Sequence, residues 1–337
     1  MIKLTLWLAW FLLLFLVCFG LGYPTLNRYS PPATHGLSDS LQYFHLVEHA
    51  PHAASGHWKY RILVPFLAKP IYWMVRGHVG SWNPVSFALL VVNSIFCAAG
   101  ASLLSLLAFK TYQNAMLAVI ASLAYLLNFT VANLDLSGLV DSAEAFWFLA
   151  LTWSLMTRRW VILPLIGLFA GLSKETFVPV AFVFATVWLV SEPKDEWTKA
   201  SAAIVGMTIV GLATVMVVRS TIDHTLVTPW QIAAQEKVVP AGFLHNLGAI
   251  FVSWSLWLTL AWLPFLFFAA KRISKAWYYA AAAGAGTALA LGMWNNASGS
   301  DTARPIFNVL GPLLALSFAL TAQAVQRSVS RSGESLS

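Results

Sequence analysis

The chain has 337 residues, of which 59% are hydrophobic and 10% are charged, and its formal net charge is +7. A soluble domain usually carries about 25% charged residues, so this chain has more apolar side chain than such a domain can bury. The basic balance does not indicate a nucleic-acid partner, because there is no basic soluble module and most of the positive charge is explained by membrane topology. Composition therefore excludes an ordinary soluble protein and favours a polytopic membrane protein.

Apolar runs long enough to cross a hydrocarbon core of about 30 Å recur along the whole chain. The first run, 4–22, is too long for a signal peptide and lacks a small-residue cleavage site, so it predicts an uncleaved helix. Further spans are predicted at 85–108, 115–134, 139–157, 160–173, 176–191, 200–218, 247–270, 276–293 and 305–323. The predicted fold class is therefore an all-α polytopic membrane protein with about ten transmembrane helices.

The lysine and arginine residues are distributed unequally between the two sets of short loops. One set carries eleven of them and the other carries four, when the long first loop is discounted. Because positive charge favours the cytoplasmic side, both termini are predicted to be cytoplasmic and loop 23–84 to lie outside. Residues 1–324 then form one transmembrane domain, and 325–337 form a polar cytoplasmic tail that we expect to be disordered.

The long first loop holds Asp39, Arg61 and most of the histidines in a protein otherwise poor in polar groups. Ser38 is placed to cap a helix that begins at Asp39 and ends before Pro51. A second stretch, 58–75, mixes aromatic and basic residues and contains two prolines, which argue against a straight span. The loop is therefore predicted to contain two short helices that lie in the membrane interface.

Several charged residues are predicted at unusual depth on the outer side. Spans 160–173 and 176–191 are short and are separated only by Lys174 and Glu175, while Asp141 and Glu144 begin another span. Ionisable groups at such depth usually face a protein interior or a water-filled cavity. The predicted substrate-binding residues, apart from the acid discussed next, are Arg61, Asp141, Glu144, Lys174, Glu175, Asp301 and Arg304. The candidates for holding a phosphate are Arg61, Lys174, Arg219 and Arg304. For Lys174 a simpler role is also open, as the ion-pair partner of Glu175 or Asp141.

Two features of the first loop can be explained either by a function or by a purely structural role. Asp39 is either a general base facing a lipid-borne substrate or a carboxylate that stabilises the first turn of its helix. His45, Glu48 and His49 match the H-x-x-E-H pattern of zinc peptidases, but no third ligand is evident, so we predict neither a metal nor another cofactor. The plain explanation for these three residues is a solvated helix face.

The layout resembles the GT-C superfamily of polytopic membrane glycosyltransferases. The segments SDSLQY, YRILVPFLA, GLSKET and DTARPIFNVLGPLLAL are similar to stretches in bacterial members of that superfamily. The resemblance implies a bacterial inner-membrane enzyme that moves a sugar from a polyprenyl-phosphate donor to a glycan, lipid or protein acceptor. It also implies that Asp39 is the catalytic base, although Asp39 stands alone where many relatives have a second acid.

Other functions remain open from the sequence. A transporter or flippase for a lipid-linked glycan would use the same charged outer cavity, but the sequence shows no half-to-half symmetry or matched broken helices. A polymerase or ligase of surface polysaccharide would handle the same kind of donor. A membrane zinc peptidase is the fourth candidate.

Overall fold

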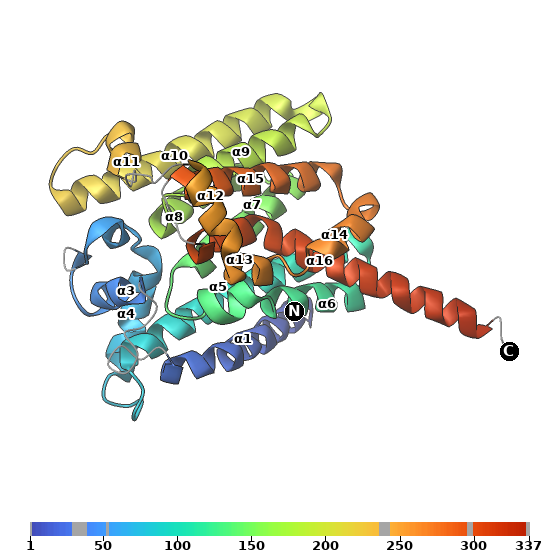
Figure 1. The fold of residues 1–337 in the computed structure, drawn as a ribbon, viewed down its shortest axis with the longest axis horizontal. Coiled ribbons are helices and arrows are strands. Elements are labelled where there is room, and N and C mark those ends of the chain that lie inside the picture. The colour runs from blue at the N-terminus through green and yellow to red at the C-terminus, as the bar shows by residue number, and fades with distance from the viewer. Residues whose placement is uncertain (1, 29–38, 52–53, 236–242, 295–298, 335–337) are drawn as a thin grey trace.

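The computed structural model describes residues 2–28, 39–51, 54–235, 243–294 and 299–334 (Figure 1). Over these ranges the chain forms fifteen α-helices, joined by short 3-10 and π segments, and no strand. The prediction of an all-α protein is therefore confirmed.

Within the described ranges, five helical stretches are long and apolar enough to cross a membrane. They are Thr5–Leu26, Pro84–Tyr112, Lys194–Asp223, Trp254–Arg272 and Asp301–Ser330. Shorter apolar helices lie at Leu63–Val75, Ala115–Leu126, Trp160–Ser173 and Phe177–Val190. Length and composition therefore support a multi-pass membrane protein.

Most predicted spans coincide with helices of the bundle. The first is α1 (Ile2–Arg28), and the later ones correspond to α5 (Pro84–Tyr112), α7 (Asp141–Met156), α8 (Leu163–Ser173), α9 (Phe177–Val190), α10 (Trp197–Asp223) and α15 (Lys275–Trp294). Pro84 begins α5 at a position where its missing N–H costs nothing, and the Asn83 side chain accepts from the N–H groups of Val85 and Ser86. α1 packs along α5, and α15 packs along α9 and α16 (Gly299–Glu334).

Two predicted spans are interrupted instead of continuous. The span predicted at 115–134 is α6 (Ala115–Leu126) followed by a π-helical turn at Val131–Asp135. The span predicted at 247–270 is divided into α12 (Phe243–Val252), α13 (Trp254–Thr259) and α14 (Leu263–Ala269). The remaining helix of this region is α11 (Pro229–Gln235).

The two interruptions meet at a buried polar contact. The Asn128 side-chain amide donates to the Thr259 carbonyl at 3.0 Å, and the Thr130 and Thr259 hydroxyls are 2.7 Å apart. These side chains form hydrogen bonds with polar groups that a helix break would leave without a partner in an apolar interior. Hydropathy did not reveal the breaks because both segments remain strongly apolar.

The polar tail is also not as predicted. α16 continues as helix to Glu334, whereas we expected disorder after residue 324, and residues 335–337 lie outside the described ranges. Figure 1 shows this part of α16 projecting from the bundle. At 1.5 Å per residue, 36 residues extend about 54 Å, so the helix is much longer than a membrane is thick.

The first loop packs as part of the bundle. Its two predicted helices are α3 (Ser40–Glu48) and α4 (Leu63–Val75), preceded by a 3-10 turn at Gly56–Tyr60. α3 buries Tyr43, Phe44 and Val47 in a core cluster shared with α4, α5 and the start of α7. Ser38 lies outside the described residues, and α3 ends at Glu48, three residues before Pro51. This packing brings the polar residues of the loop beside the N-terminal end of α7 and the C-terminal end of α10.

α8 and α10 approach each other closely at glycines. A Cβ placed on Gly167 would lie 2.2 Å from the Met207 carbonyl oxygen, and one on Gly171 would lie 2.8 Å from the Gly211 carbonyl oxygen. Gly167 and Gly171 form the small-xxx-small pattern that lets membrane helices pack backbone to backbone. The contact matters for the site because α8 ends immediately before Lys174.

Gly167→Ala is therefore expected to destabilise the protein by about 1–3 kcal/mol, because a methyl group would have to push α8 away from the α10 backbone. The unfolding midpoint in detergent measures the effect. Gly286→Ala is the matched control, because it lies within α15 with no atom within 4 Å of the added methyl group. The control is expected to be neutral or slightly stabilising. Equal midpoints for the two variants would contradict the close packing.

Candidate functional site

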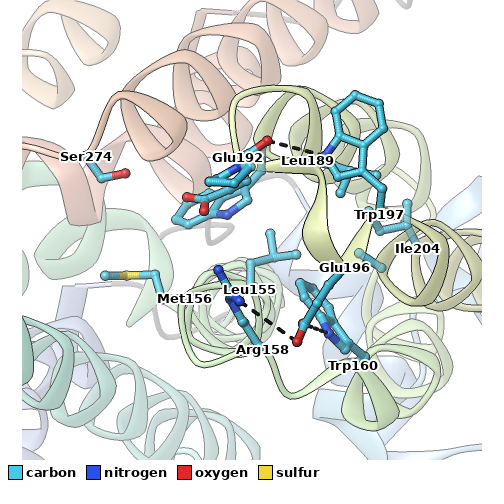
Figure 2. A pocket seen from close by; sticks show the side chains of 13 residues that line it. Leu155, Met156, Arg158, Trp160, Leu189, Glu192, Glu196, Trp197, Ile204 and Ser274 are labelled. Atoms are coloured by element: carbon cyan, nitrogen blue, oxygen red, sulfur yellow. Dashed lines mark hydrogen bonds and ion pairs between the residues drawn. The ribbon is translucent and has the colours of Figure 1, made fainter.

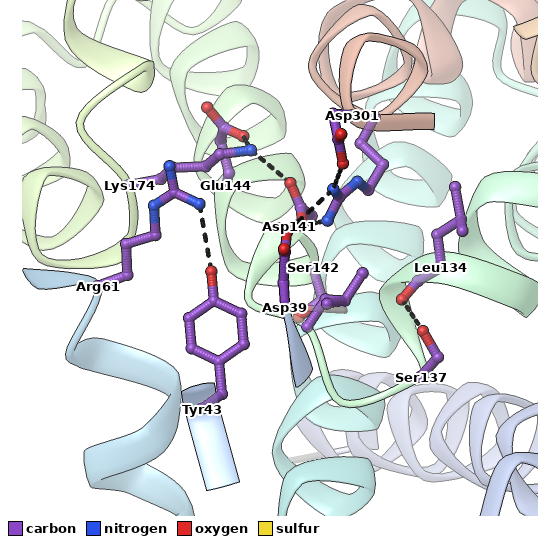
Figure 3. A network of polar contacts seen from close by, with 12 residues as sticks. Asp39, Tyr43, Arg61, Leu134, Ser137, Asp141, Ser142, Glu144, Lys174 and Asp301 are labelled. Carbon is purple, nitrogen blue, oxygen red and sulfur yellow. Dashed lines mark hydrogen bonds and ion pairs between the residues drawn. The ribbon is translucent and has the colours of Figure 1, made fainter. Parts of the chain in front are cut away.

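Lys174 lies between two acids at the centre of a buried cluster. Its Nζ atom is 2.5 Å from Asp141 Oδ1 and 3.2 Å from Glu144 Oε2. Asp141 and Glu144 occupy the first turn of α7, so their spacing of three places both on one helix face, and the helix N-terminus favours their charge. Both acid side chains are 1% exposed and the lysine is 6% exposed. Lys174 therefore neutralises two carboxylates that are otherwise removed from water (Figure 3).

Arg304 joins Asp141 to two further acids. Its Nη1 donates to Asp141 Oδ2 at 2.7 Å, while Nη2 lies 2.5 Å from Asp301 Oδ1 and 3.5 Å from Asp39 Oδ2. The arginine and Asp301 are in the first part of α16, and Asp39 precedes α3. Segments far apart in the sequence are thus held together by charge. We call this group the acidic cluster: it comprises Asp39, Asp141, Glu144, Lys174, Asp301 and Arg304.

Hydrogen bonds from neighbouring helices hold the two acids at the start of α7. Glu144 accepts from the Thr176 hydroxyl and from the Asn308 amide, each at 2.8 Å. At the start of α7, Asn93 of α5 donates to the Leu139 carbonyl at 2.9 Å and accepts from Ser142 at 2.7 Å. These contacts fix the first turn of α7 and hence the direction of its two acids.

Arg61 and Glu175 form a second ion pair beside the acidic cluster. The guanidinium donates to both carboxylate oxygens of Glu175, and its Nη1 donates to the Tyr43 hydroxyl at 3.2 Å. Burial alone would raise the pKa of Glu175, but Arg61 outweighs it and holds this pKa at about 2. Burial, followed by the charge of Arg61, lowers the pKa of His57 to about 4, so His57 adds no positive charge at neutral pH.

The 3-10 turn of the first loop contacts the end of α10. Lys59 Nζ is 2.6 Å from Asp223 Oδ1, and the Tyr60 hydroxyl donates to the other oxygen at 2.5 Å. The Arg219 guanidinium lies 4.5 Å from the centre of the Tyr60 ring, a cation–π arrangement. Lys59, Arg61 and Arg219, with Glu175 and Asp223, form the group we call the basic cluster.

The charges of the site are therefore polarised. In the acidic cluster four carboxylates surround two cations, whereas in the basic cluster three cations face two carboxylates. The consecutive residues Lys174 and Glu175 point to opposite groups, since the lysine pairs with Asp141 and the glutamate with Arg61. An anionic group is accommodated better beside the basic cluster, whereas the excess of carboxylates in the acidic cluster favours a group that takes up a proton.

Asp39 differs from the other acids near it. It is the N-cap residue of α3 but makes no side-chain capping hydrogen bond. Its side chain is 17% exposed, compared with 1% for Asp141, and it lies 3.5 Å from Arg304. Asp39 therefore makes no capping hydrogen bond, and its effect on the first turn of α3 through the helix dipole stays a prediction. The carboxylate stands partly exposed at the edge of the acidic cluster.

Two other acidic features are separate from these clusters. Asp135, in the π-helical turn after α6, is fully buried, and neither of its carboxylate oxygens has a hydrogen-bond partner among the described residues. His45, Glu48 and His49 lie on the exposed side of α3, with the two imidazole rings 6.1 Å apart. Within the described ranges, no three His, Cys, Asp or Glu side chains are grouped so as to hold a metal ion. The zinc-peptidase pattern thus gains no support from the geometry.

The structure brings together all eight site residues chosen from the sequence, and adds others. The two clusters and their hydrogen-bond partners also include Tyr43, Lys59, Tyr60, Arg219, Asp223, Thr176 and Asn308. Arg219 was considered for phosphate binding but was not included among the predicted substrate-binding residues. Lys59 and Tyr60 adjoin Arg61 in the sequence, and that adjacency was the only signal pointing to them.

Comparisons with protein families, with characterised proteins and with solved structures each return no match. Function is therefore inferred from the two clusters themselves.

Proposed function

We propose that this protein is a membrane glycosyltransferase that moves a sugar from a polyprenyl-phosphate donor to an acceptor hydroxyl at the outer face of the membrane. The observation that carries the proposal is the position of Asp39. This partly exposed carboxylate makes no capping hydrogen bond, and it lies at the edge of a charged site that also contains a basic cluster. A general base and a cationic phosphate site are the two elements that such a transfer requires.

The proposed reaction is a displacement with inversion. Asp39 removes the proton from the acceptor hydroxyl, whose oxygen attacks the anomeric carbon of the sugar. The bond from that carbon to the phosphate oxygen breaks, and the lipid phosphate leaves with the bonding electrons. The cations of the basic cluster stabilise the charge that develops on the phosphate.

Among the phosphate candidates considered from the sequence, the geometry favours Arg61 and Arg219 and adds Lys59. Lys174 and Arg304 are occupied by carboxylates of the acidic cluster, whereas Lys59 is partly exposed in a cluster with an excess of cations. We therefore assign the donor phosphate to Lys59, Arg61 and Arg219. The acidic cluster then positions Asp39 and the acceptor.

Lys59→Met is expected to weaken the binding of a polyprenyl-phosphate analogue about ten-fold, since it removes one charged contact to the phosphate. Equilibrium binding to purified protein measures this. Lys69→Met is the control, because Lys69 of α4 donates to the His49 carbonyl at 2.8 Å and belongs to neither cluster. An equal loss in both variants, or in neither, would remove the basic cluster from donor binding.

The proposal includes about ten membrane crossings, both termini in the cytoplasm and the two clusters outside, which is the topology proposed for a bacterial inner-membrane protein. A cysteine at Ser55, which is exposed, should then react with an impermeant maleimide in intact cells. The native Cys18 and Cys97 are buried and should give little background. Labelling that requires permeabilised cells would place the clusters on the cytoplasmic side.

A flippase or transporter of a lipid-linked glycan is the second candidate. The observation in its favour is the meeting of two interrupted helices at Asn128, Thr130 and Thr259, because broken helices are a feature of transporters. Proteoliposomes separate the two functions. A glycosyltransferase joins the labelled sugar to an acceptor, whereas a flippase moves the intact lipid-linked glycan across the bilayer. A ligase or polymerase would transfer a chain of sugars instead of a single one.

A further inference from the structure

A cavity of about 200 Å³ lies at the end of the bundle opposite to the two clusters. α7 begins at Asp141 in the acidic cluster and ends at Met156 beside the cavity, and 16 helical residues extend about 24 Å. The cavity is formed by the ends of α7 and α9, the turn that begins with Trp160, and the start of α10 (Figure 2). It is therefore a separate place in the fold, and nothing in the proposed sugar transfer uses it.

The lining of the cavity combines aromatic rings with charge. Trp160, Trp188 and Trp197 line it together with Glu192 and Glu196, and Arg158 is its only lining cation among the described residues. Trp160 Nε1 donates to Glu196 at 2.8 Å, and Trp197 Nε1 donates to the Glu192 carbonyl at 3.3 Å. Two of the three indole N–H groups are thus occupied. The Trp197 ring already faces one cation, because Lys194 Nζ lies 5.8 Å from its centre.

The charge of the cavity favours a cation. Arg158 Nη1 lies 3.9 Å from Glu196 and offsets that acid, whereas the Glu192 carboxylate has no hydrogen bond or ion pair within the described ranges. The helix ends at the cavity offset one another, since the C-terminal ends of α7 and α9 carry partial negative charge and the N-terminal end of α10 carries partial positive charge. Indole faces and a carboxylate together form the kind of cage that binds an organic ammonium group.

The surroundings indicate that a lipid supplies this group. Apolar side chains next to the cavity are exposed, with Val161 87% and Val190 65% exposed, and the charged Arg159, Lys194 and Lys199 follow in the adjoining loops. This change from apolar to charged surface is what a helix bundle shows where it leaves the hydrocarbon core. Arg158 is 51% exposed at the rim of the cavity, where it can meet the phosphate of a lipid whose ammonium lies inside.

We propose that this cavity binds the head group of a zwitterionic phospholipid, with the ammonium held by the three indoles and Glu192 and the phosphate by Arg158. The proposal is independent of the sugar-transfer function. It assigns a lipid site to the face of the protein opposite to the two clusters.

Short-chain phospholipids titrated into the full-length protein in detergent test the proposal. Ethanolamine or choline phospholipid should raise the unfolding midpoint saturably, and a phosphoglycerol lipid of equal chain length should not. Glu192→Gln should weaken the ammonium lipids about five-fold or more. Asp195→Asn should leave binding unchanged, because Asp195 is exposed in the same turn and does not line the cavity.

Three outcomes would overturn the proposal. Equal stabilisation by the phosphoglycerol lipid would remove the ammonium requirement. Wild-type affinity in Glu192→Gln would place the lipid elsewhere. Free phosphoethanolamine that binds as tightly as the lipid would make the ligand a soluble ammonium compound and not a membrane lipid.

Discussion

Replacing Lys174 with methionine is expected to destabilise the protein by about 3–5 kcal/mol, the largest effect on stability that we expect from a single side chain. The lysine side chain is 6% exposed and compensates Asp141 and Glu144, each 1% exposed. Methionine preserves much of the side-chain volume but removes the one described cation that contacts both buried carboxylates, while Arg304 still contacts Asp141. Unfolding by dodecyl sulfate in mixed micelles measures the change in the free energy of unfolding.

Lys59→Met provides the matched control for this measurement. It also removes a lysine from an ion pair, with Asp223 at 2.6 Å, but its side chain is 24% exposed. Solvent can replace the lost partner there, so the expected loss is about 1 kcal/mol or less. Asp141→Asn combined with Lys174→Met should recover part of the lost stability, because it removes one of the stranded charges. Similar small losses in both single variants would show that Lys174 does not compensate buried charge.

The sequence predicted the positions of many helices because apolar length and charged boundaries are local properties. Predicted span 139–157 is the helix Asp141–Met156, and predicted span 276–293 is the helix Lys275–Trp294. The interruptions were missed because they depend on partners that are distant in the sequence. Asn128 can leave the helical pattern only because Thr259, 131 residues later, accepts its hydrogen bond.

The choice of site residues from the sequence rested on a physical argument that reaches only part of the site. Charge is costly in an apolar protein, so isolated acids and bases near helix ends were expected to collect in one place. The pairing within the site could not be inferred. Nothing local indicates that Lys174 faces Asp141 while Glu175 faces Arg61, since this depends on how α8, α9 and the first loop pack. Tyr43 was read only as part of the loop and was missed because its role is to orient Arg61.

Asp39→Asn is expected to reduce turnover by about 10²-fold or more, measured as sugar transfer from a polyprenyl-phosphate donor in proteoliposomes. Asparagine preserves the shape of the side chain but cannot accept the proton of the acceptor hydroxyl. Donor binding should change little, because the phosphate is assigned to the basic cluster. Stability should fall by less than about 1 kcal/mol, because Asp39 is partly exposed and Arg304 retains Asp141 and Asp301.

The control for this experiment is Glu48→Gln, which removes an exposed carboxylate from the other end of the same helix and should leave turnover unchanged. A defect that reflected only the fold of the first loop would lower the unfolding midpoint and donor binding together with the rate. A defect in proton removal lowers the rate alone. If Asp39→Asn retained wild-type turnover, Asp39 would not be the base, and Asp301 would be the next acid to test, because its side chain is 41% exposed and shares Arg304 as a partner.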